Sequence, residues 1–305
     1  VNMLQNKKLF ESDLNPVFAH LSEHYQDVEA PKLNVCFFDI ETDFCKERGY
    51  APPEDPFLPI TSIGAYMQWC DKMYVLAVPP KTMTMETAQL MFADMPEVEL
   101  FEHESEMLTR FLDIIEDADV LSGWNSESFD IPFIVNRMIK TIGKDETRRL
   151  CHWNQRPKKR EFEKFGKMSQ TYDLVGRVHM DYLDLYLKYR MEERHSYKLD
   201  YIGEIEVGEK KVAYNGALDQ LYNKDFRKFV EYNKQDVMLL DKIDKALKYI
   251  DLASSYAHQN TVLLPTVLGA VAAIEQALIN EAHKLGVRVP NRVMKKSSQA
   301  AGAYV

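Results

Sequence analysis

Two acidic residues, Asp39 and Glu41, are separated by one residue at the end of an apolar run, LNVCFFDIETD. If this run is a strand, the two carboxylates lie side by side, because side chains two apart on a strand point to the same face. Buried carboxylates at that separation repel one another, and cations between them would remove the repulsion. The pair therefore indicates a cation site that other residues must complete.

Asp130 and Asp236 are the candidates to complete it. Asp130 stands before Ile131-Pro132 and an apolar run, where we expect a helix to begin. The simplest interpretation of Asp130 is a helix N-cap, which does not exclude a second role, because α/β sites form where strands give way to helices. Asp236 lies within an apolar helical stripe, where an unpaired carboxylate would cost several kcal/mol. Tyr232 precedes it by four residues and shares its face.

The four carboxylates offer oxygen ligands only, which suit Mg²⁺ or Mn²⁺ better than zinc. Two such ions about 3.5–4 Å apart cleave phosphodiesters: one activates the water and the other stabilises the leaving oxygen. Tyr232 can hold and orient that water through its hydroxyl. Asp-x-Glu and Tyr-x3-Asp are each common by chance, but their order and contexts together predict a two-metal centre.

The elements that must position these residues follow from hydrophobic periodicity. Residues 33–43 have apolar side chains on both faces, which is typical of a central strand covered on both sides. The other elements that we expect are a loop over 44–59, hairpin strands over 60–67 and 73–78, a helix around 107–115, a strand over 120–125, a helix from 130, helices over 178–190 and 196–205, a turn at 210–216 and a long helix over 225–251. Together they predict an α/β fold with a mixed sheet flanked by helices.

A basic segment interrupts this pattern. From Arg148 to Lys167 there are eight Lys or Arg residues, against Glu161 and Glu163. Residues 159–176 alternate between polar and apolar side chains, which favours an extended basic hairpin. From the residues alone, this segment is either a solvated surface loop or a nucleic-acid contact.

Composition sets the broad class. The 305 residues are 46% hydrophobic and 28% charged, as in soluble globular proteins, and no apolar run reaches membrane-spanning length or forms a signal peptide. The four cysteines form no CxxC pair, so neither a zinc ribbon nor a disulfide framework is indicated, and a reducing, cytoplasmic setting fits best. A net charge of −9 argues against DNA binding by bulk attraction alone.

Three segments, FDIET (38–42), GWNSESFDIPFI (123–134) and YNKQD (232–236), resemble the exonuclease motifs of family-B DNA polymerases of the T-even phage type. GRVHMDYLDLYLKY and SYKLDYIGE extend the resemblance over nearly the whole chain. The resemblance implies a DEDDy 3′→5′ proofreading exonuclease of RNase H-like fold, with an inserted β-hairpin and a helical C-terminal appendage.

The resemblance also implies roles for the site residues. Asp39 would bridge two divalent ions, Mg²⁺ or Mn²⁺, with Glu41 and Asp236 completing the water-activating site. Asp130 would hold the second ion, largely through water. Trp124 stands where many relatives carry Tyr, a conservative change.

Further residues match positions that contact DNA in the family. Asn125 and Phe129 match positions that contact the frayed primer end. The segment 161–168 matches the hairpin that helps to separate primer from template, which makes Lys164 and Lys167 candidate DNA contacts.

Three segments and several partners follow from the same resemblance. Residues 1–30 would be a remnant of the polymerase N-terminal domain, 31–255 the exonuclease domain and 256–305 the start of the palm. Because the tail SSQAAGAYV resembles the segment before the first palm motif, we expect this chain to proofread without polymerising. Helix 266–285 would expose an apolar face for the palm to cover. The implied partners are the primer 3′ end of DNA, a sliding clamp and replisome proteins, in the cytoplasm of a phage-infected host and without a membrane.

Two alternatives stay open. One is a free-standing RNase D-like ribonuclease, which would need neither the hairpin nor the palm-like tail. The other is a catalytically inactive DNA-binding or structural module, in which the site acids are lost. The basic hairpin and the palm-like tail disfavour the first alternative, and the presence of all four acids and Tyr232 disfavours the second.

Overall fold

The computed structural model describes residues 9–26, 28–164, 166–209 and 218–292. The chain divides into two compact units: a large unit, Pro31–Asp251, and a small unit that combines Val1–Ala30 with Leu252–Val305. The two end segments, which the sequence assigned to different polymerase domains, thus form one unit. Which polymerase domains these units correspond to stays a prediction.

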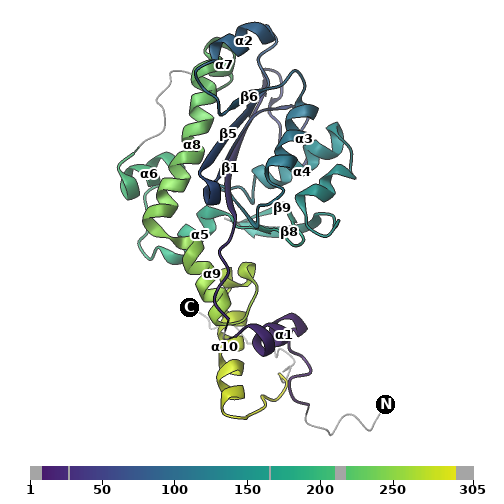
Figure 1. Ribbon diagram of the computed structural model, residues 1–305, viewed down its shortest axis with the longest axis vertical. Helices are drawn as coiled ribbons and strands as arrows, with labels where there is room; N and C mark the ends of the chain where they lie inside the picture. Colours follow the sequence, from purple (N-terminus) through teal and green to yellow (C-terminus); the bar gives the residue numbers. More distant parts are fainter. Residues whose placement is uncertain (1–8, 27, 165, 210–217, 293–305) are drawn as a thin grey trace, which may run out of the picture. The chain divides into compact units, whose positions relative to one another are not determined.

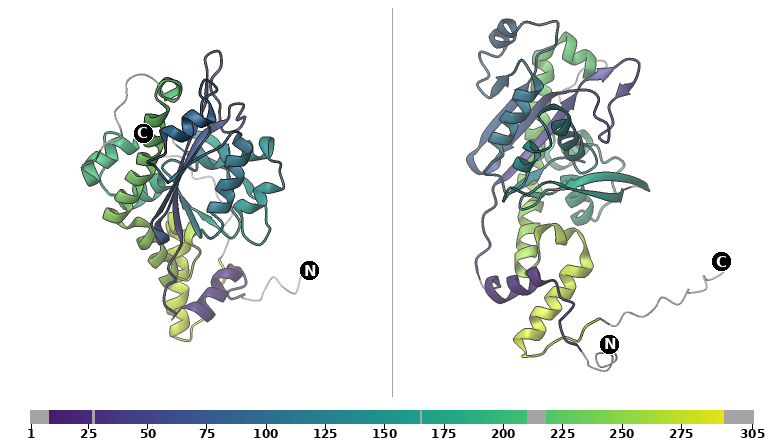
Figure 2. Two further views of the ribbon diagram at one scale, coloured as in Figure 1. Left: turned by 45° about the horizontal axis from the view of Figure 1, so that its top comes forward. Right: turned by 90° about the vertical axis from the view of Figure 1, so that its right-hand side faces the viewer.

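A mixed sheet lies at the centre of the large unit. Among the described residues, six strands are ordered β10-β7-β1-β4-β5-β6. Their bounds are Val35–Thr42 (β1), Ile60–Met67 (β4), Lys72–Ala77 (β5), Val98–Leu100 (β6), Val120–Ser122 (β7) and Val178–His179 (β10). Strand β1 is antiparallel to β4 and parallel to β7, so the predicted mixed sheet is confirmed. Helices cover both of its faces (Figures 1 and 2).

The two faces of β1 differ, as its alternating sequence requires. Cys36, Phe38 and Ile40 join a buried core with residues of α3 (Glu104–Ile114) and α4 (Asp130–Thr141). On the opposite face the Phe37 ring meets Tyr182, with ring centroids 6.3 Å apart. Asp39 faces the same way as Phe37 and contacts α8 (Phe226–Leu247) through a hydrogen bond. Asp39 therefore continues the Phe37 face, as predicted.

The remaining elements complete the two units. In the large unit they are β2 (Phe44–Cys45), β3 (Gly49–Tyr50), η1 (Gln68–Cys70), α2 (Met85–Met91), η2 (Glu146–Leu150), α5 (Tyr182–Tyr189), α6 (Leu199–Val207) and α7 (Leu218–Lys224). Helix α9 (Tyr249–Gln259) follows α8, and α1 (Pro16–Tyr25), η3 (Leu264–Leu268) and α10 (Ala270–Lys284) belong to the small unit. The turn expected at 210–216 lies outside the described residues.

Several helix boundaries differ from the prediction: the helices expected from 196 and 266 begin at Leu199 and Ala270, and two further differences concern the helices beside the acidic residues. The helix expected over 225–251 ends at Leu247, because Lys248 takes a left-handed φ of 55° and α9 begins after it. The helix expected over 178–190 begins only at Tyr182. Val178 and His179 instead extend the sheet as β10, paired with β7, and Asp181 caps the helix.

The predicted basic hairpin is present. Strands β8 (Lys158–Lys164) and β9 (Lys167–Asp173) pair antiparallel, and the ribbon projects from the large unit in the right-hand view of Figure 2. Just beyond the hairpin, the buried Arg177 guanidinium donates hydrogen bonds to carbonyls that include those of Ile115, Ala118 and Leu150. These bonds fix the base of the hairpin against the end of α3 and the end of η2.

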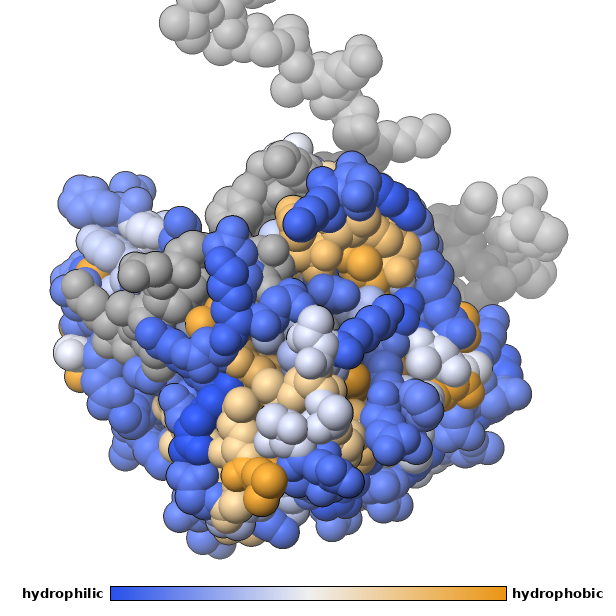
Figure 3. Space-filling view, turned by 90° about the horizontal axis from the view of Figure 1, so that it is seen from above, coloured by the Kyte–Doolittle hydropathy of each residue, from blue (hydrophilic) through white to orange (hydrophobic). Residues whose placement is uncertain are grey.

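The small unit exposes part of α10. Val271 is 76% exposed, and Ile274 and Leu278, which follow it at helical spacing, are exposed as well. The apolar face that the sequence predicted for this helix is therefore confirmed. Elsewhere, the face seen in Figure 3 is mostly hydrophilic with smaller apolar areas between. Across the part of the chain that the structure describes, no helix is both long and apolar enough to cross a membrane.

Candidate active site

Asp39 and Glu41 lie in the second half of β1, at the centre of the sheet. On the neighbouring strand β4, Asp39 is paired with Gly64 and Glu41 with Ser62. A Cβ atom at Gly64 would lie 2.8 Å from Val237 Cγ2 and 3.0 Å from Asn233 Oδ1. Because glycine has no such atom, α8 can approach the sheet closely enough to bring its polar side chains to Asp39.

Three carboxylates meet there. One oxygen from each of Asp39, Glu41 and Asp236 lies within 4.8 Å of the others. Glu41 and Asp236 are buried and Asp39 is partly buried, so water screens their mutual repulsion only weakly. An all-carboxylate set at this separation fits a hard divalent cation such as Mg²⁺ or Mn²⁺. The cluster can therefore hold metal.

Asp130, at the start of α4, also contacts β1. The N-cap of α4 is Phe129, and Asp130 is the first helical residue, so the N-cap interpretation of Asp130 was wrong. Its Oδ1 atom instead accepts a hydrogen bond from the Ile40 N–H at 3.2 Å. Burial raises the pKa of Asp130 well above that of an exposed aspartate, and the negative charge of Asp39 raises it further. Asp130 thus lies beside Asp39 but outside the three-carboxylate group.

Asn233 is a site residue that the sequence reasoning missed. Its side chain is fully buried, and its Nδ2 donates to Asp39 Oδ2 at 2.9 Å. Its Oδ1 accepts from Ser62 Oγ at 2.9 Å, which fixes the orientation of the amide. Asn233 therefore holds the Asp39 carboxylate in one orientation. Its position three residues before Asp236, on the same helix face, was the available signal.

Tyr232 lies one turn before Asp236 on α8, as predicted. It is buried, and its ring belongs to a core with Phe229 of the same helix and Val75 of β5. The role of its hydroxyl toward an attacking water stays a prediction.

The two residues predicted to contact a primer end lie in the loop between β7 and α4. Asn125 has a left-handed φ of 60°, a conformation that Asn tolerates better than most residues. Phe129 packs against the core below it, with its ring centroid 5.4 Å from that of Phe133. Their contact with DNA stays a prediction. The side chains of Lys164 and Lys167 lie outside the described part of the chain.

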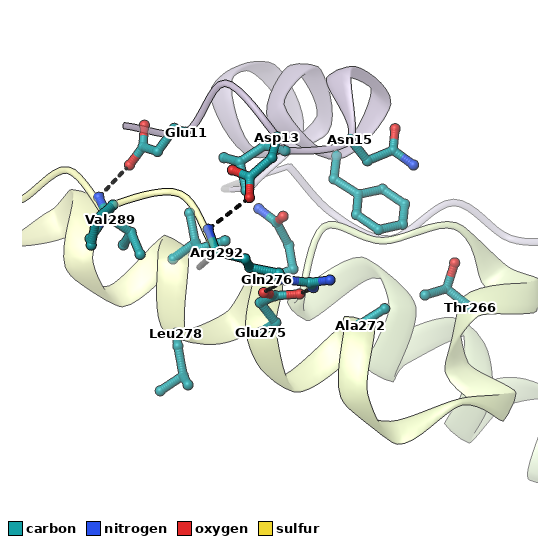
Figure 4. Close-up of a pocket in the computed structure, with 14 residues that line it drawn as sticks. Glu11, Asp13, Asn15, Thr266, Ala272, Glu275, Gln276, Leu278, Val289 and Arg292 are labelled. Atoms are coloured by element: carbon teal, nitrogen blue, oxygen red, sulfur yellow. Dashed lines mark hydrogen bonds and ion pairs between the residues drawn. The ribbon is translucent and has the colours of Figure 1, made fainter. Parts of the chain in front are cut away.

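A cavity of about 620 Å³ lies elsewhere, in the small unit. It lies between the N-terminal segment and α10, and Figure 4 shows Glu11 bonded to the Val289 N–H and Asp13 to the Arg292 N–H beside it. None of the predicted site residues lines it. The candidate active site is therefore the acidic cluster on the sheet and not this cavity.

With this geometry in place, comparison with known proteins decides the family. A family model described as DNA polymerase family B, exonuclease domain, matches residues 5–255. The chain belongs to the family B DNA polymerases. The three exonuclease motifs that suggested this family are thereby confirmed, as is the expected RNase H-like mixed α/β fold.

Individual relatives agree. The DNA-directed DNA polymerase of Escherichia phage RB69 is 26% identical over 309 residues, which cover 94% of this chain and 34% of the relative. The DNA-directed DNA polymerase of Enterobacteria phage T4 is 25% identical over 207 residues, covering 67% of this chain and 23% of the relative. The DNA polymerase delta catalytic subunit of Bos taurus is 25% identical over 303 residues, covering 95% of this chain and 26% of the relative.

The chain thus spans about a third or less of the length of these relatives. The match to an exonuclease domain of this family indicates that the chain is a nuclease.

Proposed function

We propose that the large unit is a 3′→5′ proofreading exonuclease that hydrolyses the terminal phosphodiester of DNA and releases nucleoside monophosphates. The observation that carries this proposal is the meeting of the Asp39, Glu41 and Asp236 carboxylates within 4.8 Å, in a chain of this family. Carboxylates that repel one another at the centre of a buried sheet are costly unless they bind cations.

Two divalent ions, Mg²⁺ or Mn²⁺, are the proposed cofactors. Asp39, Glu41 and Asp236 would hold one, and Asp39 with Asp130 the other. When bound, such a pair activates a water molecule and stabilises the leaving oxygen of a phosphodiester.

The chain's own residues prepare this site. The hydrogen bond from Asn233 holds Asp39 in place, so that the carboxylate need not reorganise when substrate arrives. Tyr232 would orient the attacking water with its hydroxyl. Asn125 and Phe129 would hold the frayed primer end over the carboxylates.

The test is a gel assay with a 5′-labelled single-stranded DNA, in Mg²⁺ or Mn²⁺ and in EDTA, beside Asp39→Ala. We expect a metal-dependent ladder that shortens from the 3′ end and is absent for the variant. A 5′-labelled RNA of the same sequence tests the RNase D-like alternative, which predicts faster cleavage of the RNA. Tight DNA binding by a folded protein without any ladder would favour the inactive module instead.

The hairpin has a separate proposed role, which is to keep primer and template strands apart. Replacement of Lys164 and Lys167 by alanine should slow the cleavage of duplex ends more than that of single strands. The control is the same pair of substrates with the unaltered chain. An equal loss on both substrates would contradict strand separation.

Further proposals concern the whole polymerase. The large unit would be the exonuclease domain, residues 1–30 part of an N-terminal domain and residues 256–305 the start of the palm. The exposed apolar face of α10 is one that a palm domain would cover. DNA, a sliding clamp and replisome proteins would be the partners of that polymerase, and the phage relatives favour the cytoplasm of an infected host.

A further inference from the structure

The loop between β7 and α4, residues 123–129, forms hydrogen bonds with other segments of the chain. It carries Asn125 and Phe129, and Asn125 has a left-handed φ of 60°. Asn tolerates this conformation better than most non-glycine residues, and hydrogen bonds to the backbone beside it can hold it in place. At the start of the loop, a Cβ atom at Gly123 would lie 2.8 Å from Ser126 Cβ, so the turn is tight.

The carboxylate of Asp181 supplies such bonds. Asp181 is 2% exposed. Its Oδ1 accepts a hydrogen bond from the Asn125 N–H at 2.8 Å, and its Oδ2 accepts one from the Glu127 N–H at 3.2 Å. The Oδ1 atom also accepts the Leu183 N–H at 3.0 Å, which makes Asp181 the N-cap of α5. One buried carboxylate therefore joins the first turn of α5 to the backbone of the loop at Asn125 and at Glu127.

Neighbouring residues support the same contact. The Tyr182 N–H donates to the Gly123 carbonyl at 2.9 Å, and His179 Nε2 lies 2.8 Å from Ser126 Oγ in a hydrogen bond. The segment 179–182 therefore contacts the first half of the loop along its length. On the side of the hairpin, Glu127 forms an ion pair with Arg160 of β8. Asp181 bonds directly to Asn125.

We propose that Asp181 is a positioning residue of the exonuclease: through the Asn125 and Glu127 N–H groups it fixes the loop that holds the primer end over the carboxylates. This inference rests on the proposed function, because it needs Asn125 and Phe129 to contact DNA. The alternative is that Asp181 serves only as the N-cap of α5. The two roles can be separated because they use different hydrogen bonds of one side chain.

Asp181→Ser separates them. Serine caps helices about as well as aspartate, so α5 keeps its cap, but its shorter side chain no longer reaches the loop. We expect kcat/KM on single-stranded DNA to fall roughly a hundredfold, as small displacements of substrate-positioning groups do. Asp225→Ser is the matched control, because Asp225 is the N-cap of α8 through the Lys228 N–H, and we expect kcat/KM to be unchanged there.

A double-mutant cycle decides whether Asp181 acts through the loop. If it does, Asp181→Ser should cost far less in a chain that already carries Asn125→Ala and Phe129→Ala, because the groups it positions are gone. A cap-only role predicts the same fractional loss in both backgrounds, or no loss of kcat/KM with lowered thermal stability only. Either of these results would overturn the proposal.

Asp181→Asn keeps the proposal testable if the serine variant does not fold. Its carbonyl can still accept the Asn125 and Leu183 N–H groups, while its amide meets the Glu127 N–H donor with another donor. We expect a smaller loss of kcat/KM in the same direction, and full activity would contradict the proposal. Failure of the proposed function looks different, because the unaltered chain would then give no 3′ ladder in Mg²⁺ or Mn²⁺.

Discussion

Helix α8 contributes to two sets of carboxylates about two turns apart, and the surroundings of the two sets differ. At Asp236, one carboxylate oxygen lies within 4.8 Å of an oxygen from each of Asp39 and Glu41, so three acids meet at one place. At Asp244, protein donors surround the carboxylate: Tyr182 Oη at 3.0 Å and the Ile250 N–H at 3.4 Å from Oδ1, and Gln68 Nε2 at 3.4 Å from Oδ2.

Asp241 completes the second set and shows the same pattern. It is fully buried, yet Gln68 Nε2 lies 3.3 Å from its Oδ1 and Lys245 Nζ lies 2.7 Å from its Oδ2. The second set therefore has hydrogen-bond donors and one lysine beside its carboxylates. The first set gathers negative charge at one point, which suits it to a bound cation. Burial alone thus does not identify a catalytic acid, whereas the partners of the acid do.

The largest expected effect separates the two sets by activity. Asp236→Ala should lower DNA cleavage at least roughly a thousandfold, because loss of a metal ligand removes several kcal/mol of transition-state stabilisation. The free energy of unfolding without metal should stay the same or rise, because one repelling charge is gone. Gel assays and urea unfolding of the same preparation measure both. If Asp236→Ala cleaves DNA about as fast as the unaltered chain, Asp236 is not a metal ligand.

The second-largest expected effect is a loss of stability without a loss of activity. Asp244→Ala should lower the free energy of unfolding by about 2–4 kcal/mol, because the Tyr182 hydroxyl and the Gln68 amide lose an acceptor in the interior. Cleavage per folded molecule should be unchanged. Tyr182→Phe, which removes one of these bonds, should cost only about 1 kcal/mol. A loss of cleavage with full stability would place Asp244 in the active site after all.

These two sets also show how much of the site could be predicted from the sequence. The period of two in β1 was enough to place Asp39 and Glu41 on one face, and the helical stripe was enough to place Asp236 opposite them, because both patterns are local. Asp244 belongs to the same helix, and no local pattern marks its partners. Tyr182 and Gln68 come from α5 and η1, and their contact with α8 depends on tertiary packing.

The same reason accounts for the residues that were missed or misassigned. Asn233 orients Asp39 only because Gly64 lets α8 approach β4, a contact between segments far apart in the sequence. Asp130 looked like an N-cap because its sequence context is that of a helix start. Its actual partner is the Ile40 N–H of β1, 90 residues earlier in the chain. The break after Leu247 was missed because Lys248 takes a left-handed conformation that usually calls for glycine.

Added metal should raise the free energy of unfolding through the Asp236 set and not through the Asp244 set. The expected change is smaller than that caused by Asp244→Ala. At a Mg²⁺ concentration ten times its dissociation constant, the unaltered chain should gain about 1.4 kcal/mol in free energy of unfolding, because the ion binds the folded state only. Asp244→Ala should show the same gain from its lower starting point, and Asp236→Asn should lose most of it. Urea unfolding with Mg²⁺ and with EDTA measures the gain. An equal gain in the Asp236→Asn chain would place the metal elsewhere.

The smallest expected effect comes from the titration of Asp244. Burial raises the pKa of Asp244 above its ordinary value, and its hydrogen bonds from Tyr182, the Ile250 N–H and Gln68 offset this only in part. Between the unfolded-state pKa, about 3.9, and this raised pKa, the folded state binds more protons than the unfolded state. Asp244 therefore contributes stability at acid pH that is lost as the pH rises through its folded pKa.

Asp244→Asn removes this titration. Urea unfolding in EDTA over that pH range should therefore show a shallower fall in stability with rising pH for the variant than for the unaltered chain. The other buried carboxylates are present in both chains, so the difference between the two curves belongs to Asp244 and its partners. A variant whose stability falls as steeply as that of the unaltered chain would show that hydrogen bonding fully compensates the burial of Asp244.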